Sequence, residues 1–233
     1  MTVKRIKTAR FLSNMLDPGI CPGCQHALAC AQTFCSRCRQ RLSCVVNPCR
    51  LCGLQNQNAD ELCAACLYDP PRWQRMIAPL QYRGFARELL LQLKFSESLY
   101  LANTLTATVV HHFSGAAPPE VLLPVPLHRQ RLLERGFNQA YEIARLLSSR
   151  LNIKLDGNTL TRIRHTQAQA GLSATAREKN ILKAFHCKPS DYQHVALIDD
   201  IITTGSTASE ITKTLHQTSI KTVEIWGMAR VVK

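Results

Sequence analysis

A repeated cysteine pattern constrains the N-terminal part of this chain more than any other feature. Each half of the repeat reads C-x₂-C-x₁₀-C-x₂-C, and Cys49 follows Cys21 by 28 residues (49 − 21). The eight cysteines are Cys21, Cys24, Cys35, Cys38, Cys49, Cys52, Cys63 and Cys66. A C-x-x-C turn directs two sulfurs at one point, so two turns complete a tetrahedral thiolate shell for Zn²⁺. The repeat predicts two structural zinc sites, formed most simply by neighbouring turns, while a crossed pairing of the turns stays open.

Disulfides and a redox site are the two alternatives for these cysteines. Disulfides suit small exported domains. Residues 1–16 lack the continuous apolar core of a signal peptide and predict a short amphipathic helix instead. A redox site would use one C-x-x-C, whereas this repeat has four. We therefore expect a cytoplasmic protein whose cysteine module folds on metal.

Three further cysteines, Cys30, Cys44 and Cys187, lie outside the repeat. Unpaired cysteine behaves as a small apolar residue with a weak thiol donor. We expect these three to be small buried residues or free thiols.

The length and composition allow one large domain and a small appendage. The chain has 233 residues, 45% of them apolar, which suffices for one α/β domain with a large core. Asp69-Pro70-Pro71 is typical of a linker. We expect a zinc-ribbon-like module with an N-terminal helix over residues 1–70 and a second domain over residues 71–233. No apolar run reaches the roughly 18 residues of a membrane span.

The net charge of +13 lies mostly in the second domain. Before Pro70 the chain has 8 basic and 4 acidic residues, and from Pro70 onward it has 21 and 12. Two zinc tetrathiolates, each with a charge of about −2, would nearly cancel the first excess. The second excess indicates an anionic partner, either a phosphorylated small molecule or nucleic acid, with a basic surface kept for solubility as the alternative. Aromatic residues make up 6% and are not interleaved with basic ones, so no base-stacking platform is predicted.

Strand-like and helix-like segments alternate after residue 71. Apolar runs over 121–125, 194–198 and 222–232 predict strands. Helices are predicted over 87–95, 99–113, 138–151 and 207–217. This alternation predicts an α/β fold with a mostly parallel sheet flanked by helices.

The most informative stretch, VALIDDIITTGST, runs from Val195 to Thr207. It joins a buried strand to the carboxylates of Asp199 and Asp200 and then to a hydroxyl-rich turn that opens a helix. The turn consists of Thr203, Thr204, Gly205, Ser206 and Thr207. Ligands of open α/β sheets bind at such strand ends, and amides at a helix N-terminus suit a phosphate dianion. Two adjacent carboxylates beside a phosphate require a ligand with hydroxyl groups or a metal.

This stretch resembles the thirteen-residue phosphoribosyl-pyrophosphate motif of phosphoribosyltransferases. The resemblance implies a type I phosphoribosyltransferase fold for the second domain. It also implies that Asp199 and Asp200 bind the ribose hydroxyls, that the turn binds the 5-phosphate, and that Mg²⁺ accompanies the ligand. A Walker A loop is excluded, because no G-x-x-x-x-G-K-[ST] occurs.

Nearly the whole chain resembles the competence protein F family, whose relatives support DNA uptake in transformation and the use of DNA as a nutrient. The N-terminal cysteine turns, a double zinc ribbon, carry part of the resemblance. Further matching segments are Leu93-Lys94-Phe95, Pro124-Val125-Pro126-Leu127-His128 and Arg135-Gly136-Phe137-Asn138-Gln139. Spaced matches follow at Arg162, Arg164, Thr166, Gln169, Leu172, Arg177, Asn180, Ala184 and Phe185. The resemblance implies phosphoribosyl pyrophosphate, single-stranded DNA and proteins of the DNA-uptake machinery as partners.

In phosphoribosyltransferases the loop after the first sheet strand cradles pyrophosphate, and the resemblance assigns this loop to residues 126–137. Its basic residues are His128, Arg129, Arg131 and Arg135. A guanidinium matches phosphate oxygens, although a solvated basic face is the alternative for Arg129 and Arg131. In a catalytic reading, Arg135 and Mg²⁺ would stabilise the departing pyrophosphate while Asp199 and Asp200 hold the ribose. A mobile segment that closes over the site would correspond to residues 162–177.

One position departs from purine-salvage phosphoribosyltransferases. They often have an aspartate that accepts a base proton where this chain has Thr203, whose hydroxyl has no pKa near neutrality. Purine-base transfer is therefore not expected. Three functions stay open: a ligand-binding protein that handles internalised single-stranded DNA, an active phosphoribosyltransferase with an unknown acceptor, and a non-catalytic sensor of the ligand.

Overall fold

The computed structural model describes residues 19–28, 32–57, 61–95, 99–113, 117–164 and 180–232. The chain forms two compact units, Met1–Leu42 and Ser43–Lys233. The second cysteine group therefore shares a unit with the sheet, while the domain boundary expected near residue 70 stays a prediction. The helix expected over residues 1–16 lies outside the described residues, as does Cys30.

The first unit is organised around the first four cysteines of the repeat. An isolated bridge joins Ile20 to Ala27, and the short helix α2 (Ser36–Gln40) follows. Cys35 caps this helix, because its Sγ accepts a hydrogen bond from the Cys38 N–H at 3.4 Å. The buried residues are Cys21, Leu28, Phe34, Cys38 and Leu42. So small an apolar set makes the described part of this unit dependent on its cysteines.

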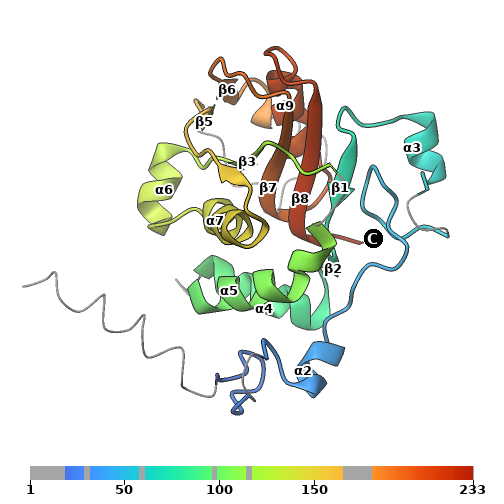
Figure 1. Cartoon of the computed structure of the whole chain (residues 1–233), viewed down its shortest axis with the longest axis vertical. Coiled ribbons are helices and arrows are strands. Elements are labelled where there is room, and N and C mark those ends of the chain that lie inside the picture. The colour runs from blue at the N-terminus through green and yellow to red at the C-terminus, as the bar shows by residue number, and fades with distance from the viewer. Residues whose placement is uncertain are drawn as a thin grey trace, which may run out of the picture. The chain divides into compact units, whose positions relative to one another are not determined.

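The second unit contains a six-stranded sheet (Figure 1). Its strands are β1 (Arg75–Ile77), β2 (Leu80–Gln81), β3 (Val121–Pro124), β4 (Lys154–Leu155), β7 (His194–Ile202) and β8 (Thr222–Arg230). The order is β1-β8-β7-β3-β4, with β2 also paired to β8, and these pairs are parallel. The apolar runs of β3, β7 and β8 are continuous because both faces of a parallel sheet are buried.

Helices cover both faces of this sheet (Figure 1). On one face α9 (Ser206–Leu215) buries Ala208, Ile211 and Leu215 against alternate residues of β7 and β8. The other face carries α4 (Gly84–Phe95), α5 (Leu99–Val109) with its 3₁₀ extension η1 (Val110–Phe113), and α7 (Gln139–Leu151). The predicted α/β fold class, a mostly parallel sheet with flanking helices behind a cysteine-rich region, is confirmed. Within the described ranges, none of the helices has the length and apolar character needed to cross a membrane.

Two smaller features complete the second unit. Strands β5 (Leu160–Arg162) and β6 (Phe185–Cys187) form an antiparallel pair. Helix α3 (Ala64–Tyr68) forms part of the fourth cysteine turn, with Cys63 as its N-cap residue and Cys66 buried within it. Of the mobile segment expected over residues 162–177, residues 165–177 lie outside the described part. Cys187 is buried and Cys44 is exposed, and both are free thiols, as expected.

The stretch 126–137, expected to be a loop, contains the helix α6 (Arg129–Arg135). His128 caps its start, since the Gln130 N–H donates to His128 Nδ1 at 3.3 Å, and Gly136 with φ of 76° ends it. Because α6 buries no residue, it leaves no apolar period in the sequence. The other predicted helices and strands are confirmed to within a few residues, and β7 continues beyond its predicted end to Ile202.

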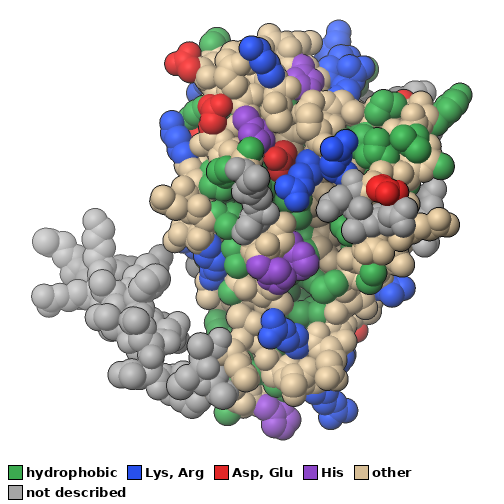
Figure 2. All heavy atoms as spheres, turned by 45° about the vertical axis from the view of Figure 1, so that its right-hand side comes forward, with side chains coloured by type: hydrophobic (Ala, Val, Ile, Leu, Met, Phe, Trp, Pro, Cys, Tyr) green, Lys and Arg blue, Asp and Glu red, His purple; other side chains and the backbone are tan. Residues whose placement is uncertain are grey.

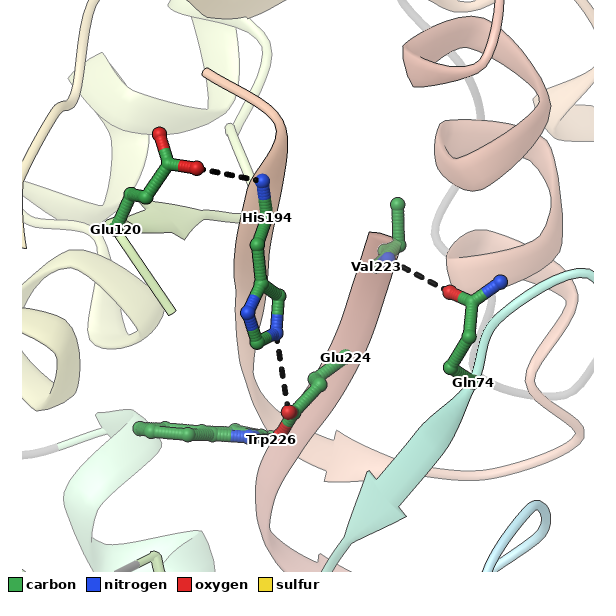
Figure 3. A network of polar contacts seen from close by, with 6 residues as sticks. All are labelled: Gln74, Glu120, His194, Val223, Glu224 and Trp226. Atoms are coloured by element: carbon green, nitrogen blue, oxygen red, sulfur yellow. Dashed lines mark hydrogen bonds and ion pairs between the residues drawn. The ribbon is translucent and has the colours of Figure 1, made fainter. Parts of the chain in front are cut away.

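A polar network closes the amino-terminal edge of the sheet (Figure 3). Glu224 on β8 is buried and accepts a hydrogen bond from Trp226 Nε1 at 2.8 Å. Its other oxygen lies 3.1 Å from His194 Nε2 at the start of β7. Glu120 accepts from the backbone N–H of His194 at 3.2 Å. These polar groups bond to one another, and ligands of such sheets bind at the opposite, carboxyl-terminal edge.

Candidate functional site

Two groups of four cysteine sulfurs are each arranged to hold one metal ion. The first group is Cys21, Cys24, Cys35 and Cys38, and the second is Cys49, Cys52, Cys63 and Cys66. Within each group the Sγ atoms lie within 4.8 Å of one another, and the Cys24–Cys35 and Cys52–Cys63 Sγ distances are 3.6 and 3.7 Å. A zinc tetrahedron with Zn–S bonds of about 2.3 Å has sulfurs about 3.8 Å apart. The sulfurs fit zinc, and neighbouring rather than crossed turns form each group.

The thiols within each group differ widely in acidity. Burial raises the pKa of Cys21, but backbone N–H groups outweigh it and lower that pKa to about 6. The same balance lowers the pKa of Cys49 to about 7. Burial and neighbouring sulfurs instead raise the pKa of Cys38 to about 12, and burial raises the pKa of Cys52 to about 11. Each group therefore favours one thiolate on its own, and a divalent cation would let the remaining sulfurs ionise.

The hydroxyl-rich turn lies at the carboxyl-terminal end of β7 and opens α9. Gly205 is the N-cap residue of α9 and has φ of 84°, a left-handed conformation that favours glycine. Thr204 Oγ1 and Ser206 Oγ lie 2.6 Å apart, and the Ser206 N–H donates to Thr204 Oγ1 at 3.3 Å. The first amides of a helix have no partner within it, so this turn offers amides and hydroxyls to a phosphate dianion.

Asp199 and Asp200 lie just before this turn, within β7. Asp199 Oδ1 accepts from the Asp200 N–H at 2.9 Å, and Asp200 Oδ1 accepts from the Ile201 N–H at 2.8 Å. Burial raises the pKa of Asp199 well above its usual range, and the charge of Asp200 raises it further, while the charge of Arg162 opposes the rise. Two carboxylates so placed repel one another, and a cation or a ligand rich in hydroxyl groups relieves the repulsion. Mg²⁺ and a ribose both fit this pair of oxygen donors.

Three arginines share the electrostatic neighbourhood of the carboxylates. Arg131 and Arg135 lie on α6, and Arg162 ends β5. Burial lowers the pKa of Arg135, and the charge of Arg131 lowers it further, while Asp200 opposes both effects. Burial also lowers the pKa of Arg162, again with Arg131 adding to the effect and Asp199 opposing it. Cations from two distant segments thus lie within electrostatic range of the acidic pair, and guanidinium groups suit the oxygens of a phosphorylated ligand.

The basic residues predicted on the stretch 126–137 differ in burial and in hydrogen-bond partners. Arg135 is half-buried and donates to Gln139 Oε1 at 3.4 Å. His128 serves as the N-cap of α6, and Arg129 is exposed on the first turn of that helix. Arg162 was expected as the start of a mobile segment and as one of the matches to the competence protein F family. It lies on β5, with its guanidinium 5.5 Å from the centre of the Phe185 ring. The charge of Asp200 acts on Arg135, and that of Asp199 acts on Arg162.

Three known proteins are similar to this chain over most or much of its length. It is 34% identical over 224 residues to the DNA utilization protein YhgH of Escherichia coli, covering 91% of this chain and 97% of that protein. It is 34% identical over 222 residues to competence protein F of Haemophilus influenzae, covering 91% and 90%. It is 26% identical over 170 residues to competence protein ComFC of Bacillus subtilis, covering 68% and 67%.

No protein-family model matches the chain. Among solved structures, an adenine phosphoribosyltransferase from Leishmania donovani covers 58% of this chain and 55% of its own, with a TM-score of 0.36 and 13% identity.

Proposed function

The chain belongs to the family of competence protein F and DNA utilization protein YhgH, and on this basis we propose that it binds Mg²⁺-phosphoribosyl pyrophosphate and handles internalised single-stranded DNA. One observation carries the ligand part of the proposal. On β7 the carboxylates of Asp199 and Asp200 repel one another, and a hydroxyl-rich turn at the N-terminus of α9 follows them directly. A sugar phosphate brings hydroxyl groups to the first and a dianion to the second.

Each part of the ligand would meet a chemically suited part of the site. Asp199 and Asp200 would accept hydrogen bonds from the ribose hydroxyls, and Thr203 to Thr207 would donate to the 5-phosphate. Hydrogen bonds to charged groups contribute about 1.5–3 kcal/mol each. Arg135 would face the pyrophosphate, and Mg²⁺ would neutralise part of the pyrophosphate charge when bound.

The metal groups would hold structural zinc. We propose one Zn²⁺ for each set of four sulfurs, since the spacing of the sulfurs matches a zinc tetrathiolate and the thiols do not all ionise alone. All four ligands of each site come from the protein, as in structural rather than catalytic zinc sites.

An active phosphoribosyltransferase is a second candidate, favoured by the position of Arg135. Its guanidinium and the Asp200 carboxylate act on one another, so a cation stands near the place where pyrophosphate would leave. Thr203 supplies no base for a purine proton, and we do not propose purine transfer. A sensor would bind the same ligand without releasing pyrophosphate. Pyrophosphate release with a panel of bases, amines and single-stranded DNA separates these functions.

The DNA part of the proposal rests on the relatives and on charge. The relatives are named for competence and for DNA utilization, and this chain has a net charge of +13. Figure 2 shows Lys and Arg side chains spread over the visible face rather than gathered in one stripe. Such a surface would bind phosphates of DNA without reading sequence. We propose that this occurs in the cytoplasm, with DNA-uptake proteins as further partners.

Calorimetric titration with phosphoribosyl pyrophosphate tests the ligand proposal. We expect saturable binding that requires Mg²⁺ and that is lost in an Asp199→Ala/Asp200→Ala double variant. Asp191→Ala is the control, since Asp191 is an exposed aspartate in the loop before β7. Equal affinity in the double variant and in the control variant would refute the placement of the site.

A further inference from the structure

The metal-binding turn Cys49–Cys52 is bonded to the sheet through three consecutive backbone carbonyls. The carbonyl of Arg50 accepts from the Met76 N–H at 2.8 Å. The carbonyl of Leu51 accepts from Trp73 Nε1 at 2.6 Å, and that of Cys52 from Arg230 Nε at 2.8 Å. The backbone that presents Cys49 and Cys52 to the metal is therefore held by Trp73 just before β1, by β1 itself and by the last residue of β8.

Two of those three donors also touch the hydroxyl-rich turn of residues 203–207, the proposed phosphate-binding turn. Arg230 Nη1 donates to the carbonyl of Ile202 at 3.0 Å and also to the carbonyl of Thr203. The Trp73 ring lies against Gly205, where a Cβ atom would be 3.2 Å from the ring edge. Both side chains are 7% exposed, so neither has room to swing away. Arg230 and Trp73 each bridge the metal-binding turn and the phosphate-binding turn.

The charges at this bridge are complementary. The Arg230 guanidinium is buried and donates to the carbonyl of Cys52, a residue of the second metal group. A zinc ion with four thiolates carries about two negative charges. The buried guanidinium therefore lies where it stabilises a loaded second metal group and holds the carbonyls of the phosphate-binding turn at the same time.

We propose that Arg230 and Trp73 are positioning residues that couple the second zinc site to the phosphate-binding turn. A metal in the second group holds the turn in its binding geometry, and a bound phosphoribosyl pyrophosphate in return retains that metal. The ligand in this coupling is the one in the proposed function, so that part rests on the proposed function. The hydrogen bonds that carry the coupling do not depend on it. By linkage, the two effects have the same factor. Within the second unit, these bridges tie the second half of the cysteine repeat to the sheet.

Metal release provides a readout that a merely structural role would not change. A Cys21→Ser/Cys24→Ser variant leaves one metal, in the second group, whose release to a chromophoric chelator is followed with and without Mg²⁺-phosphoribosyl pyrophosphate. When the ligand leaves the rate of metal association unchanged, the whole coupling factor falls on the release rate, so we expect the ligand to slow release by about tenfold, a typical coupling. In this background Trp73→Phe keeps an aromatic ring on Gly205 but removes the Nε1 donor to the Leu51 carbonyl. Arg230→Lys removes the guanidinium, whose separate nitrogens donate to Cys52 and to residues 202 and 203. Both should retain the metal and reduce the slowing to about twofold or less.

The matched control is Trp226→Phe, which removes the Nε1 donor to Glu224 at the other edge of the sheet. It should keep the full slowing. Equal slowing in Trp73→Phe, Arg230→Lys and Trp226→Phe would overturn the proposal.

Amide hydrogen exchange separates failure of the coupling from failure of the ligand assignment. Without any ligand, Cys52→Ser should speed exchange of the Ser209 N–H, which is bonded to the Gly205 carbonyl at 2.8 Å, whereas Cys24→Ser should not. If phosphoribosyl pyrophosphate does not bind but this difference appears, the coupling stands and the ligand proposal fails. If Cys52→Ser loses its metal and exchange is unchanged, the coupling is wrong whatever the ligand.

Discussion

Replacing Gly205 with alanine should disturb the proposed phosphate-binding turn in two additive ways. Its φ of 84° costs a residue with a Cβ atom about 1–2 kcal/mol. The new Cβ would also lie 3.2 Å from the Trp73 ring, which is held by its hydrogen bond to Leu51 and has little room to retreat. Overpacking of this kind costs about 1–3 kcal/mol. Together they lower the free energy of unfolding by about 2–5 kcal/mol, or the thermal midpoint by about 5–15 °C.

Gly84→Ala is the matched control, because Gly84 also has positive φ, 47°, but its Cβ would meet no atom within 4 Å. We expect it to lose about 1–2 kcal/mol and to keep full affinity for phosphoribosyl pyrophosphate. Gly205→Ala should weaken that affinity by about tenfold or more, since its turn would shift away from the phosphate. Calorimetric scanning and titration measure both quantities. The reasoning is refuted if the two variants lose the same stability and bind the ligand equally well.

Three further predictions concern charge, metal and DNA. Because the pKa of Asp199 is raised in the folded state, its stabilising contribution is present below its ordinary pKa near 4 and is lost as pH rises through the raised value. Asp199→Asn should therefore raise the thermal midpoint at neutral pH, with the gain vanishing toward about pH 4; a constant difference across pH would contradict this. Metal analysis should find two Zn²⁺ per chain and one in Cys52→Ser, because three thiolates do not close a structural site; two metals in that variant would show that Cys52 is no ligand. Fluorescence anisotropy should show single-stranded DNA binding that falls steeply with salt and competes with Mg²⁺-phosphoribosyl pyrophosphate, and salt-independent binding would remove the electrostatic account.

The cysteine groups and the sheet were predictable because their signals are local. A C-x-x-C turn fixes two sulfurs within four residues, and the 28-residue repeat leaves neighbouring turns as the simplest partners, as the structure has them. The strands of the sheet centre are buried on both faces, so β3, β7 and β8 are uninterrupted apolar runs. The segment that includes β7 also contains Asp199, Asp200 and the turn after them. Because they follow the apolar run in the sequence, they are predicted at the carboxyl-terminal edge of the sheet.

Other features were beyond prediction because their causes are distant in sequence or leave no period. Helix α6 buries no residue, so only its His128 and Gly136 caps mark it. Arg230 lies in an apolar strand, yet it bonds Cys52, 178 positions earlier in the chain. Trp73 follows the predicted Pro-Pro linker, and nothing near it indicates that its partner is a carbonyl 22 residues earlier. Arg162 comes within electrostatic range of Asp199 only after the chain folds.

A crystal structure with phosphoribosyl pyrophosphate and Mn²⁺ in place of Mg²⁺ tests the central claim most directly. We predict the 5-phosphate within hydrogen-bonding distance of the amides of residues 204–207, and the ribose hydroxyls on Asp199 and Asp200. The anomalous signal of Mn²⁺ should lie beside the pyrophosphate, on the side of Arg135. Ligand density at any other place, or crystals that stay empty at saturating ligand, would contradict the assignment of this site.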